Sequence, residues 1–316
     1  MNNYSLHYNN INLTPAKCIV DSRLECDTSV QFGTRTFSMP IYPSNMKTVI
    51  DEATCIFFAQ KGFFYTMHRF GTNNIEFCKR MMSLDIFTSI SIGINQDSYD
   101  ELERLYMENI IPDYITIDVA NAWSEKTHKM IDYIKEKFPF SFLIVGNVAT
   151  SEACLALDEW GADSAKIGIS CGKVCITRNK TGFSRDMVTT ILDCAKSDIK
   201  IPLIADGGIA EHGDIAKALV CGAHMTMAGS LFAGYDQSAG QIIEIDDKMY
   251  KEYYGSASKY NKETYSNIEG RKIMIPYRGD MERLLKELKE DLQSSIAYSG
   301  ANDLEGLRKA KFEIRM

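Results

Sequence analysis

Apolar runs rich in β-branched residues alternate with amphipathic stretches along most of the chain. Helical periodicity is found between the apolar runs, for example at residues 97–109, 125–138, 151–160, 187–197 and 213–221. Parallel strands are buried on both faces, so their sequences are nearly continuous in apolar residues. Eight alternating units predict an α/β fold that closes into a (β/α)8 barrel, the TIM-barrel architecture. The eight predicted strands are residues 39–46, 63–69, 88–94, 114–120, 142–149, 164–170, 201–209 and 225–232.

Polar residues or glycines follow the apolar part of almost every predicted strand. In a barrel these positions open onto the face formed by the carboxyl ends of the strands, where barrel enzymes have their active sites. Each of them alone is equally well explained as a turn residue, but their recurrence indicates a functional site. The positions are Ser44-Asn45, His68-Arg69, Gly93, Asp118, Gly146-Asn147, Gly168, Asp206-Gly207-Gly208 and Gly229-Ser230.

The remaining segments give no sign of a second domain, because the sequence has no internal repeat, low-complexity tract or proline-rich linker. Residues 1–316 are therefore predicted to form a single barrel domain. Residues 235–277 are polar and tyrosine-rich, and we expect a long loop or flap over the barrel mouth after the eighth strand. Residues 280–295 are amphipathic and are predicted to form the last barrel helix.

Composition narrows the class of partner. The net charge of −7 disfavours general binding to nucleic acid or to an anionic membrane, but not to a small anion held by backbone N–H groups. No apolar run has the length of a membrane span, and the first residues lack the apolar core of a signal peptide. The nine cysteines show no zinc-site spacing, so reduced thiols in a cytoplasmic protein are expected.

The loop after the sixth predicted strand, residues 168–177 (GISCGKVCIT), is the strongest candidate for chemistry. Its glycines allow sharp turns and close approach to a ligand. Cysteines are more often small buried residues than nucleophiles. Here, however, nearby N–H dipoles at a strand end favour the thiolate form, which predicts that Cys175 is a nucleophile. Cys171 lies on the same loop and is not assigned a role.

Two further loops predict a phosphate and ribose site. Asp206-Gly207-Gly208 follows the seventh strand and Gly229-Ser230 follows the eighth, and these two loops form the usual phosphate site of barrels. Asp206 is placed to accept hydrogen bonds from vicinal ribose hydroxyls, although an ordinary helix cap is the alternative. No GxGxxG motif opens a βαβ unit, so any dinucleotide is expected to bind on the barrel face itself.

These motifs together resemble the GMP reductase family, which is related to IMP dehydrogenase. The resemblance implies reductive deamination of GMP to IMP and ammonia with NADPH. Cys175 would attack carbon 2 of the purine, while Thr177 and Glu269 form a proton relay with Glu269 as the general acid. The resemblance covers nearly the whole chain in order, at residues 22–28 (SRLECDT), 43–46 (PSNM), 67–70 (MHRF), 168–177, 180–182 (KTG), 205–209 (ADGGI), 212–217 (HGDIAK), 229–234 (GSLFAG), 254–258 (YGSAS) and 269–270 (EG).

The same resemblance assigns the remaining site residues. A homotetramer is implied, with NADPH as the cofactor, and the backbone carbonyls of Gly172 and Cys175 are expected to hold a monovalent cation such as K+. The flap would supply Tyr254, Gly255 and Ser256 to the substrate and its phosphate. The cofactor or base would lie near Asn45, His68, Arg69, Asp118 and Gly168, although His68 and Arg69 are equally explained as residues that cap a strand.

Two other functions remain open. An IMP dehydrogenase usually carries an insertion of paired regulatory domains, of the CBS type, after the second strand, and an Arg-Tyr pair that activates water. The short interval of residues 68–88 has no room for such domains, and the chain contains no Arg-Tyr dipeptide. A non-catalytic purine-nucleotide sensor is the other alternative, but a sensor has no use for a relay of Cys175, Thr177 and Glu269.

The sequence also departs from the family pattern. Ser170 and Cys171 replace a glycine and a proline of the usual cysteine loop, so Ser170 is strained if that position requires a positive φ. Asn121-Ala122-Trp123 replaces a histidine-containing run after Asp118, on the side that faces the cofactor. These changes leave open a divergent paralogue that acts on another purine nucleotide.

Overall fold

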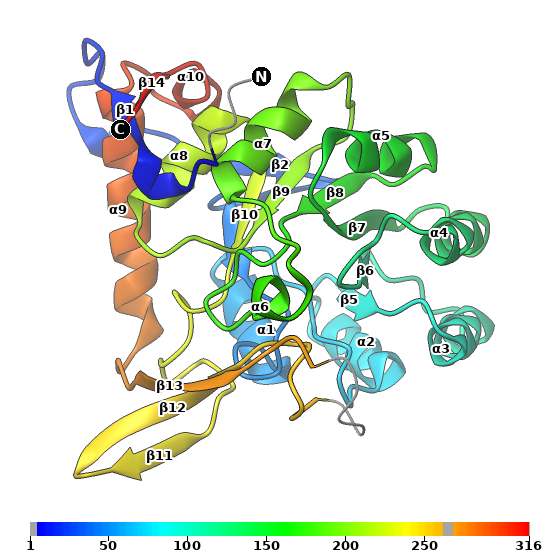
Figure 1. Cartoon of the computed structure of the whole chain (residues 1–316). Helices are drawn as coiled ribbons and strands as arrows, with labels where there is room; N and C mark the ends of the chain where they lie inside the picture. The colour runs from blue at the N-terminus through cyan, green and yellow to red at the C-terminus, as the bar shows by residue number, and fades with distance from the viewer. Residues whose placement is uncertain (1–4, 262–267, 316) are drawn as a thin grey trace.

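The computed structural model describes residues 5–261 and 268–315. Its centre is a curled sheet of seven parallel strands in the order β4-β10-β9-β8-β7-β6-β5, with helices on its outside (Figure 1). The strands are short and almost entirely buried, as expected for a sheet covered on both faces. They are β4 (Ile41–Pro43), β5 (Ser89–Ile92), β6 (Tyr114–Asp118), β7 (Phe142–Val148), β8 (Ser164–Ile167), β9 (Leu203–Asp206) and β10 (Met225–Ala228). The predicted α/β barrel class is confirmed.

The prediction of a strand at residues 63–69, the second of the eight, was wrong. This segment occupies the eighth position between β4 and β5 but joins β5 through one isolated parallel bridge, Met67 to Ile90. Side chains replace most of the backbone ladder there. Ser91 Oγ donates to the Met67 carbonyl at 2.5 Å, and Thr66 Oγ1 lies 3.0 Å from Ser89 Oγ.

The helices predicted from periodicity are confirmed to within three residues at either end. Side chains accept hydrogen bonds from free N–H groups at several of their starts, as Ser124 does from Thr127 and Thr150 does from Ala153. The first two outer helices, α1 and α2, were not among the predicted ones. The helices are α1 (Glu52–Gln60), α2 (Asn74–Ser83), α3 (Gln96–Met107), α4 (Glu125–Lys137), α5 (Ser151–Glu159), α7 (Met187–Lys196), α8 (Gly213–Cys221), α9 (Met281–Tyr298) and α10 (Leu304–Leu307), with short 3-10 turns η1 (Tyr8–Asn10) and η2 (Arg23–Glu25).

A hairpin that the sequence analysis did not predict closes one end of the barrel. Its strands β2 (Val30–Phe32) and β3 (Arg35–Phe37) carry two buried aromatic rings to the amino ends of the parallel strands. Phe32 lies 4.9 Å from Phe142 between ring centroids, and Phe37 lies 5.3 Å from Phe64. This aromatic plug fills the end of the barrel opposite the carboxyl ends of the strands.

The predicted flap contains more regular structure than a loop. β11 (Ile242–Ile245), β12 (Lys248–Tyr254) and β13 (Lys272–Pro276) form a three-stranded antiparallel sheet, and the β11–β12 ribbon extends away from the barrel (Figure 1). Residues 262–267 of the flap lie outside the described residues. Elsewhere, β1 (Ile11–Thr14) pairs antiparallel with β14 (Lys311–Ile314), which brings the first and last described segments together.

Candidate active site

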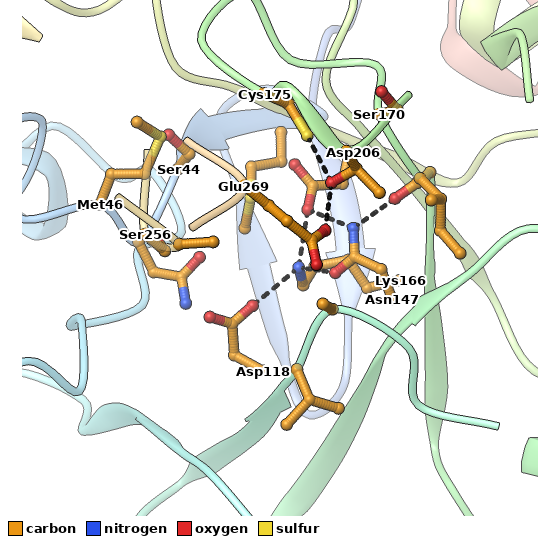
Figure 2. Close-up of a pocket in the computed structure, with 18 of the residues that line it drawn as sticks. Ser44, Met46, Asp118, Asn147, Lys166, Ser170, Cys175, Asp206, Ser256 and Glu269 are labelled. Carbon is orange, nitrogen blue, oxygen red and sulfur yellow. Dashed lines mark hydrogen bonds and ion pairs between the residues drawn. The ribbon is translucent and has the colours of Figure 1, made fainter. Parts of the chain in front are cut away.

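A cavity of about 280 Å³ opens at the carboxyl ends of the parallel strands. It joins predicted site residues from segments that are far apart in the sequence: the β4, β6, β8 and β9 ends, the cysteine loop and the flap. Charged and polar side chains from several elements converge in it, as Figure 2 shows. Of the predicted site residues, it is lined by Asn45, Arg69, Asp118, Gly168, Cys175, Thr177, Asp206, Ser256 and Glu269.

Two residues in the left-handed region turn the chain out of β8 into the cysteine loop. Gly168 has φ of +133°, and a Cβ there would meet the Asp206 carbonyl oxygen at 2.5 Å. Ser170 has φ of +66°, which confirms the strain expected where serine replaces glycine. The Ser170 hydroxyl accepts a hydrogen bond from the Arg178 N–H at 3.1 Å. The loop therefore keeps a glycine-like path.

Three predicted catalytic side chains form one chain of hydrogen bonds. Thr177 begins the short helix α6 (Thr177–Thr181), and its Oγ1 lies 3.2 Å from the sulfur of Cys175. The same hydroxyl donates to Glu269 Oε2 at 2.5 Å. Figure 2 shows the sulfur and the carboxylate at the two ends of this chain. A proton can pass between a carboxyl group and a molecule beside the sulfur through the Thr177 hydroxyl.

Cys171, the second cysteine of the loop, has a different environment. Its sulfur donates to the Arg185 carbonyl at 3.3 Å, and burial followed by the Asp206 charge raises the pKa of the thiol to about 12. A buried thiol that stays protonated is not a nucleophile. Only Cys175, which lies between buried and exposed, lines the cavity among the cysteines.

The flap reaches the catalytic loop by backbone pairing, which places Glu269. The Ile176 N–H donates to the Glu269 carbonyl at 2.8 Å, and the Arg271 N–H donates to the Val174 carbonyl at 2.9 Å. Between them Cys175 and Gly270 form an antiparallel bridge. The pairing fixes the register of the two segments, so the Glu269 side chain meets Thr177.

Lys166 lies at the centre of the cavity floor and was missed by the sequence analysis. Only 1% of it is exposed, and its Nζ donates to Asp206 Oδ2 at 2.6 Å, to Asp118 Oδ1 at 3.1 Å and to Asn147 Oδ1. Burial opposes its charge, but Asp206 and Asp118 outweigh burial and hold the pKa of Lys166 above its ordinary value. One signal was available: a lysine inside an otherwise apolar strand (SAKIGIS) needs a buried partner.

Two buried polar groups at the cavity have no hydrogen-bond partner among the described residues, and the exposed Arg69 beside them has no paired carboxylate there. Ser44 Oγ and Asn45 Nδ2 are buried without hydrogen bonds. Arg69 donates its Nε to the Asp118 carbonyl at 3.2 Å and stacks over Phe70, with no carboxylate paired to it in the described part of the chain. Unpaired buried donors cost free energy, so they indicate a polar ligand.

The predicted cofactor residue His68 does not line this cavity. It is buried beside it, where its Nδ1 accepts a hydrogen bond from the Phe70 N–H at 3.2 Å and lies 3.2 Å from the Thr72 hydroxyl. Burial, with a smaller effect of Lys47, lowers the pKa of His68 to about 4. The imidazole is therefore neutral near pH 7, and it holds the chain turn that carries Arg69.

Apart from Asp206, the residues of the predicted phosphate loops border the cavity rather than line it. A Cβ on Gly229 would lie 2.2 Å from the Tyr253 hydroxyl and 3.0 Å from Ser44 Oγ, so only a glycine lets these groups converge. The neighbouring residues have backbone partners or lie in a second cavity of about 430 Å³ on the far side of the cysteine loop. Gly208 lines that second cavity. In the other loop residues, the Gly207 N–H donates to the Met227 carbonyl and the Ser230 carbonyl accepts from Arg278. In the flap, the Tyr254 N–H donates to the Thr48 hydroxyl, and Gly255 packs against Val174.

Two other predicted features have backbone roles. The Gly172 carbonyl, a predicted cation ligand, accepts a hydrogen bond from the Cys175 N–H at 3.0 Å. In the altered segment after β6, the Ala122 N–H donates to the Asn147 carbonyl at 2.9 Å, and half of Trp123 is exposed. The segment is thus anchored beside Asn147, while its tryptophan faces outward.

None of the described helices is long and apolar enough to span a membrane.

Comparison with known proteins gives consistent results along the whole chain. Residues 5–316 match the family model described as "IMP dehydrogenase / GMP reductase domain". A GMP reductase of Chromobacterium violaceum is 56% identical over 306 residues, covering 97% of this chain and 96% of the relative. A GMP reductase of Acidovorax sp. is 50% identical over 309 residues, covering 97% and 95%, and one of Lactobacillus johnsonii is 48% identical over 321 residues, covering 99% and 97%.

Proposed function

The chain belongs to the IMP dehydrogenase / GMP reductase family, and we propose that it is a GMP reductase that converts GMP to IMP and ammonia in purine nucleotide salvage. The observation that carries the proposal is the hydrogen-bonded chain from Cys175 through Thr177 to Glu269. It offers a nucleophile and a proton donor that line the same cavity. The names of the similar proteins support the same substrate.

The first half of the reaction uses the residues of this chain alone. The Cys175 thiolate attacks carbon 2 of the guanine, and a carbon–sulfur bond forms. The amino group on that carbon leaves as ammonia, and the proton that it needs comes from Glu269 through the Thr177 hydroxyl. The product is a thioimidate between Cys175 and the purine.

The second half is a reduction. A bound NADPH would supply the hydride that carbon 2 needs. The carbon–sulfur bond then breaks, its electron pair returns to the sulfur, and IMP is released while the Cys175 thiolate is restored. Asn45, Arg69 and Asp118 fit the cofactor. They supply an amide N–H without a hydrogen-bond partner, a guanidinium without a paired carboxylate in the described part of the chain, and a carboxylate.

The substrate would lie across the opposite side. Asp206 would accept hydrogen bonds from the ribose hydroxyls, and the N–H groups of Gly208, Gly229 and Ser230 would hold the phosphate. The flap would close over it with Tyr254, Gly255 and Ser256. The proposal includes a K+ ion on the carbonyls of Gly172 and Cys175, and assembly as a homotetramer.

The test is the loss of NADPH absorbance in the presence of GMP, with Cys175→Ala beside the wild type and Cys171→Ala as a control on the same loop. We expect turnover in the wild type and in Cys171→Ala, and none in Cys175→Ala. Reduction of NAD+ with IMP instead would identify a dehydrogenase. Tight GMP binding without turnover would favour a sensor or a paralogue with another purine substrate, and no binding would overturn the proposal.

A further inference from the structure

Lys166 is a charged side chain that the proposed reaction steps do not use. It stands on β8 with 1% of its surface exposed, and it lines the same cavity as Cys175. Residue 146 on β7 has to be a glycine for Lys166 to lie this close, because a Cβ on Gly146 would be 2.5 Å from the Lys166 Cβ. Burying an ammonium group is costly unless it is fully paired, so its partners define its role.

The partners are the two carboxylates that the proposed function gives to different ligands. Lys166 Nζ lies 2.6 Å from Asp206 Oδ2, on the ribose side, and 3.1 Å from Asp118 Oδ1, on the cofactor side. Asn147 completes the network, since its Nδ2 donates to Asp206 Oδ2 at 2.8 Å and to the Gly168 carbonyl at 2.7 Å. Figure 2 shows the ammonium at the centre of these groups.

The network divides each carboxylate into an internal and an open oxygen. Both internal donors of Asp206 bind Oδ2, so Oδ1 has no hydrogen-bond partner among the described residues. Lys166 likewise binds only Oδ1 of Asp118, and Oδ2 is open in the described structure. A carboxylate with one oxygen tied down cannot rotate away, which leaves the other oxygen oriented for a ligand.

We infer that Lys166 is a positioning residue that holds Asp206 and Asp118 together, so that one ammonium group orients the acceptor for the substrate ribose and the acceptor for the cofactor. This inference rests on the proposed function. It predicts that a single substitution of Lys166 weakens the binding of both ligands at once, through the two carboxylates. If Lys166 served only the stability of the fold, its substitution would lower the free energy of unfolding, and the folded molecules would bind both ligands with unchanged affinity.

The experiment measures KM for GMP and for NADPH, together with GMP binding by calorimetry, in Lys166→Met. We expect KM to rise ~10-fold or more for both ligands, because charge-assisted hydrogen bonds of this type contribute that much to affinity. Lys251→Met is the matched control. Lys251 is also buried, at 4% exposed, but among the described residues its Nζ binds only the backbone carbonyls of Asp236 and Ser238. The control should lose stability and keep both KM values.

Lys166→Met leaves two carboxylates without a counter-ion, and it can therefore fail to fold. Lys166→Met/Asp118→Asn removes one of these charges, and it is compared with Asp118→Asn. The inference holds if GMP affinity is ~10-fold weaker in the double variant than in Asp118→Asn. It is overturned if the folded single variant keeps both KM values, or if the double variant and Asp118→Asn bind GMP equally. No GMP binding or turnover in the wild type would instead refute the proposed function.

Discussion

At the scale of single residues, Thr177 is the only hydroxyl that joins the Cys175 sulfur to the Glu269 carboxylate among the described residues. Thr177→Val keeps the shape of the side chain and removes that link. We expect kcat to fall by about 10²–10⁴, the usual contribution of general acid–base catalysis, with GMP affinity changed little. Steady-state kinetics and GMP calorimetry measure the two effects. Thr190→Val on α7 is the control, and an equal loss of kcat there would contradict the relay.

Gly168 allows a second prediction in which backbone strain and steric contact can be separated. Gly168 and Gly161 both have positive φ, at +133° and +94°, but only at Gly168 would a Cβ meet other atoms. Gly161→Ala should destabilise the chain by about 1 kcal/mol through strain alone. Gly168→Ala should cost a further ~1–3 kcal/mol, since the Asp206 carbonyl has to move. Urea unfolding compares them, and equal losses would refute the contact.

His68 gives a prediction for pH. Its pKa is lowered to about 4 in the folded chain and is ordinary, near 6.5, in the unfolded chain, so the unfolded state binds the proton more strongly. Stability is therefore lost as pH falls from about 6.5 toward 4, and at pH 5 this group should account for about 2 kcal/mol.

The check on His68 is a comparison of urea midpoints at pH 7 and pH 5. The fall in stability should be smaller in His68→Gln than in the wild type. His128→Gln, at a more exposed histidine on α4, should behave as the wild type does. If His68→Gln shows the same fall as the wild type, the buried imidazole is not its source.

At the scale of elements, the active site depends on the pairing of residues 269–271 with residues 174–176. A Cβ on Gly270 would lie 2.9 Å from the Ser258 nitrogen, although the φ of Gly270 is not positive. Gly270→Ala should push this pairing apart and remove Glu269 from Thr177. We expect a loss of kcat of at least ~10-fold with little change in thermal stability. Gly213→Ala, where a Cβ meets open space, should have normal kinetics.

Elements also show what sequence patterns can and cannot predict. Strands such as β8 and helices such as α4 were predicted because their periodicity reflects local burial. The aromatic plug was missed because Phe32 and Phe37 acquire their role only against rings that are distant in sequence, such as Phe64 and Phe142. Residues 63–69 have the composition of a strand, but composition does not tell whether backbone or side chains make the hydrogen bonds.

The residues of the candidate site also differ in whether the sequence could predict them. Cys175, Thr177 and Glu269 were expected to meet, and the structure brings them together. That expectation came from the family resemblance, because 92 positions separate Thr177 from Glu269. Lys166 was missed, since its three partners lie on different strands and no local motif connects them. Strand-end polarity identified Asp118, Asn147 and Asp206 one by one, but not the ammonium group that joins them.

At the scale of the whole molecule, the β1–β14 pair ties the first described segment to the last. Ile11 of β1 is fully buried, and Phe312 of β14 packs against the core. A chain that ends at Ala310 should lose ~2 kcal/mol of stability, because this apolar surface becomes exposed. Thermal unfolding measures the loss. A chain that ends at Ile314 keeps the strand and is the control, and equal stability of the two chains would show that the pair contributes nothing.

The aromatic plug determines where ligands can enter and leave the barrel. Phe32 and Phe37 close one end of the barrel. In the described structure the cavity therefore opens only at the other end, at the carboxyl ends of the strands. A ligand bound across this opening would prevent a ligand bound deeper in the cavity from leaving. The flap segment that carries Glu269 lines the cavity at this mouth, so a ligand that enters or leaves passes beside the carboxylate of the proposed relay.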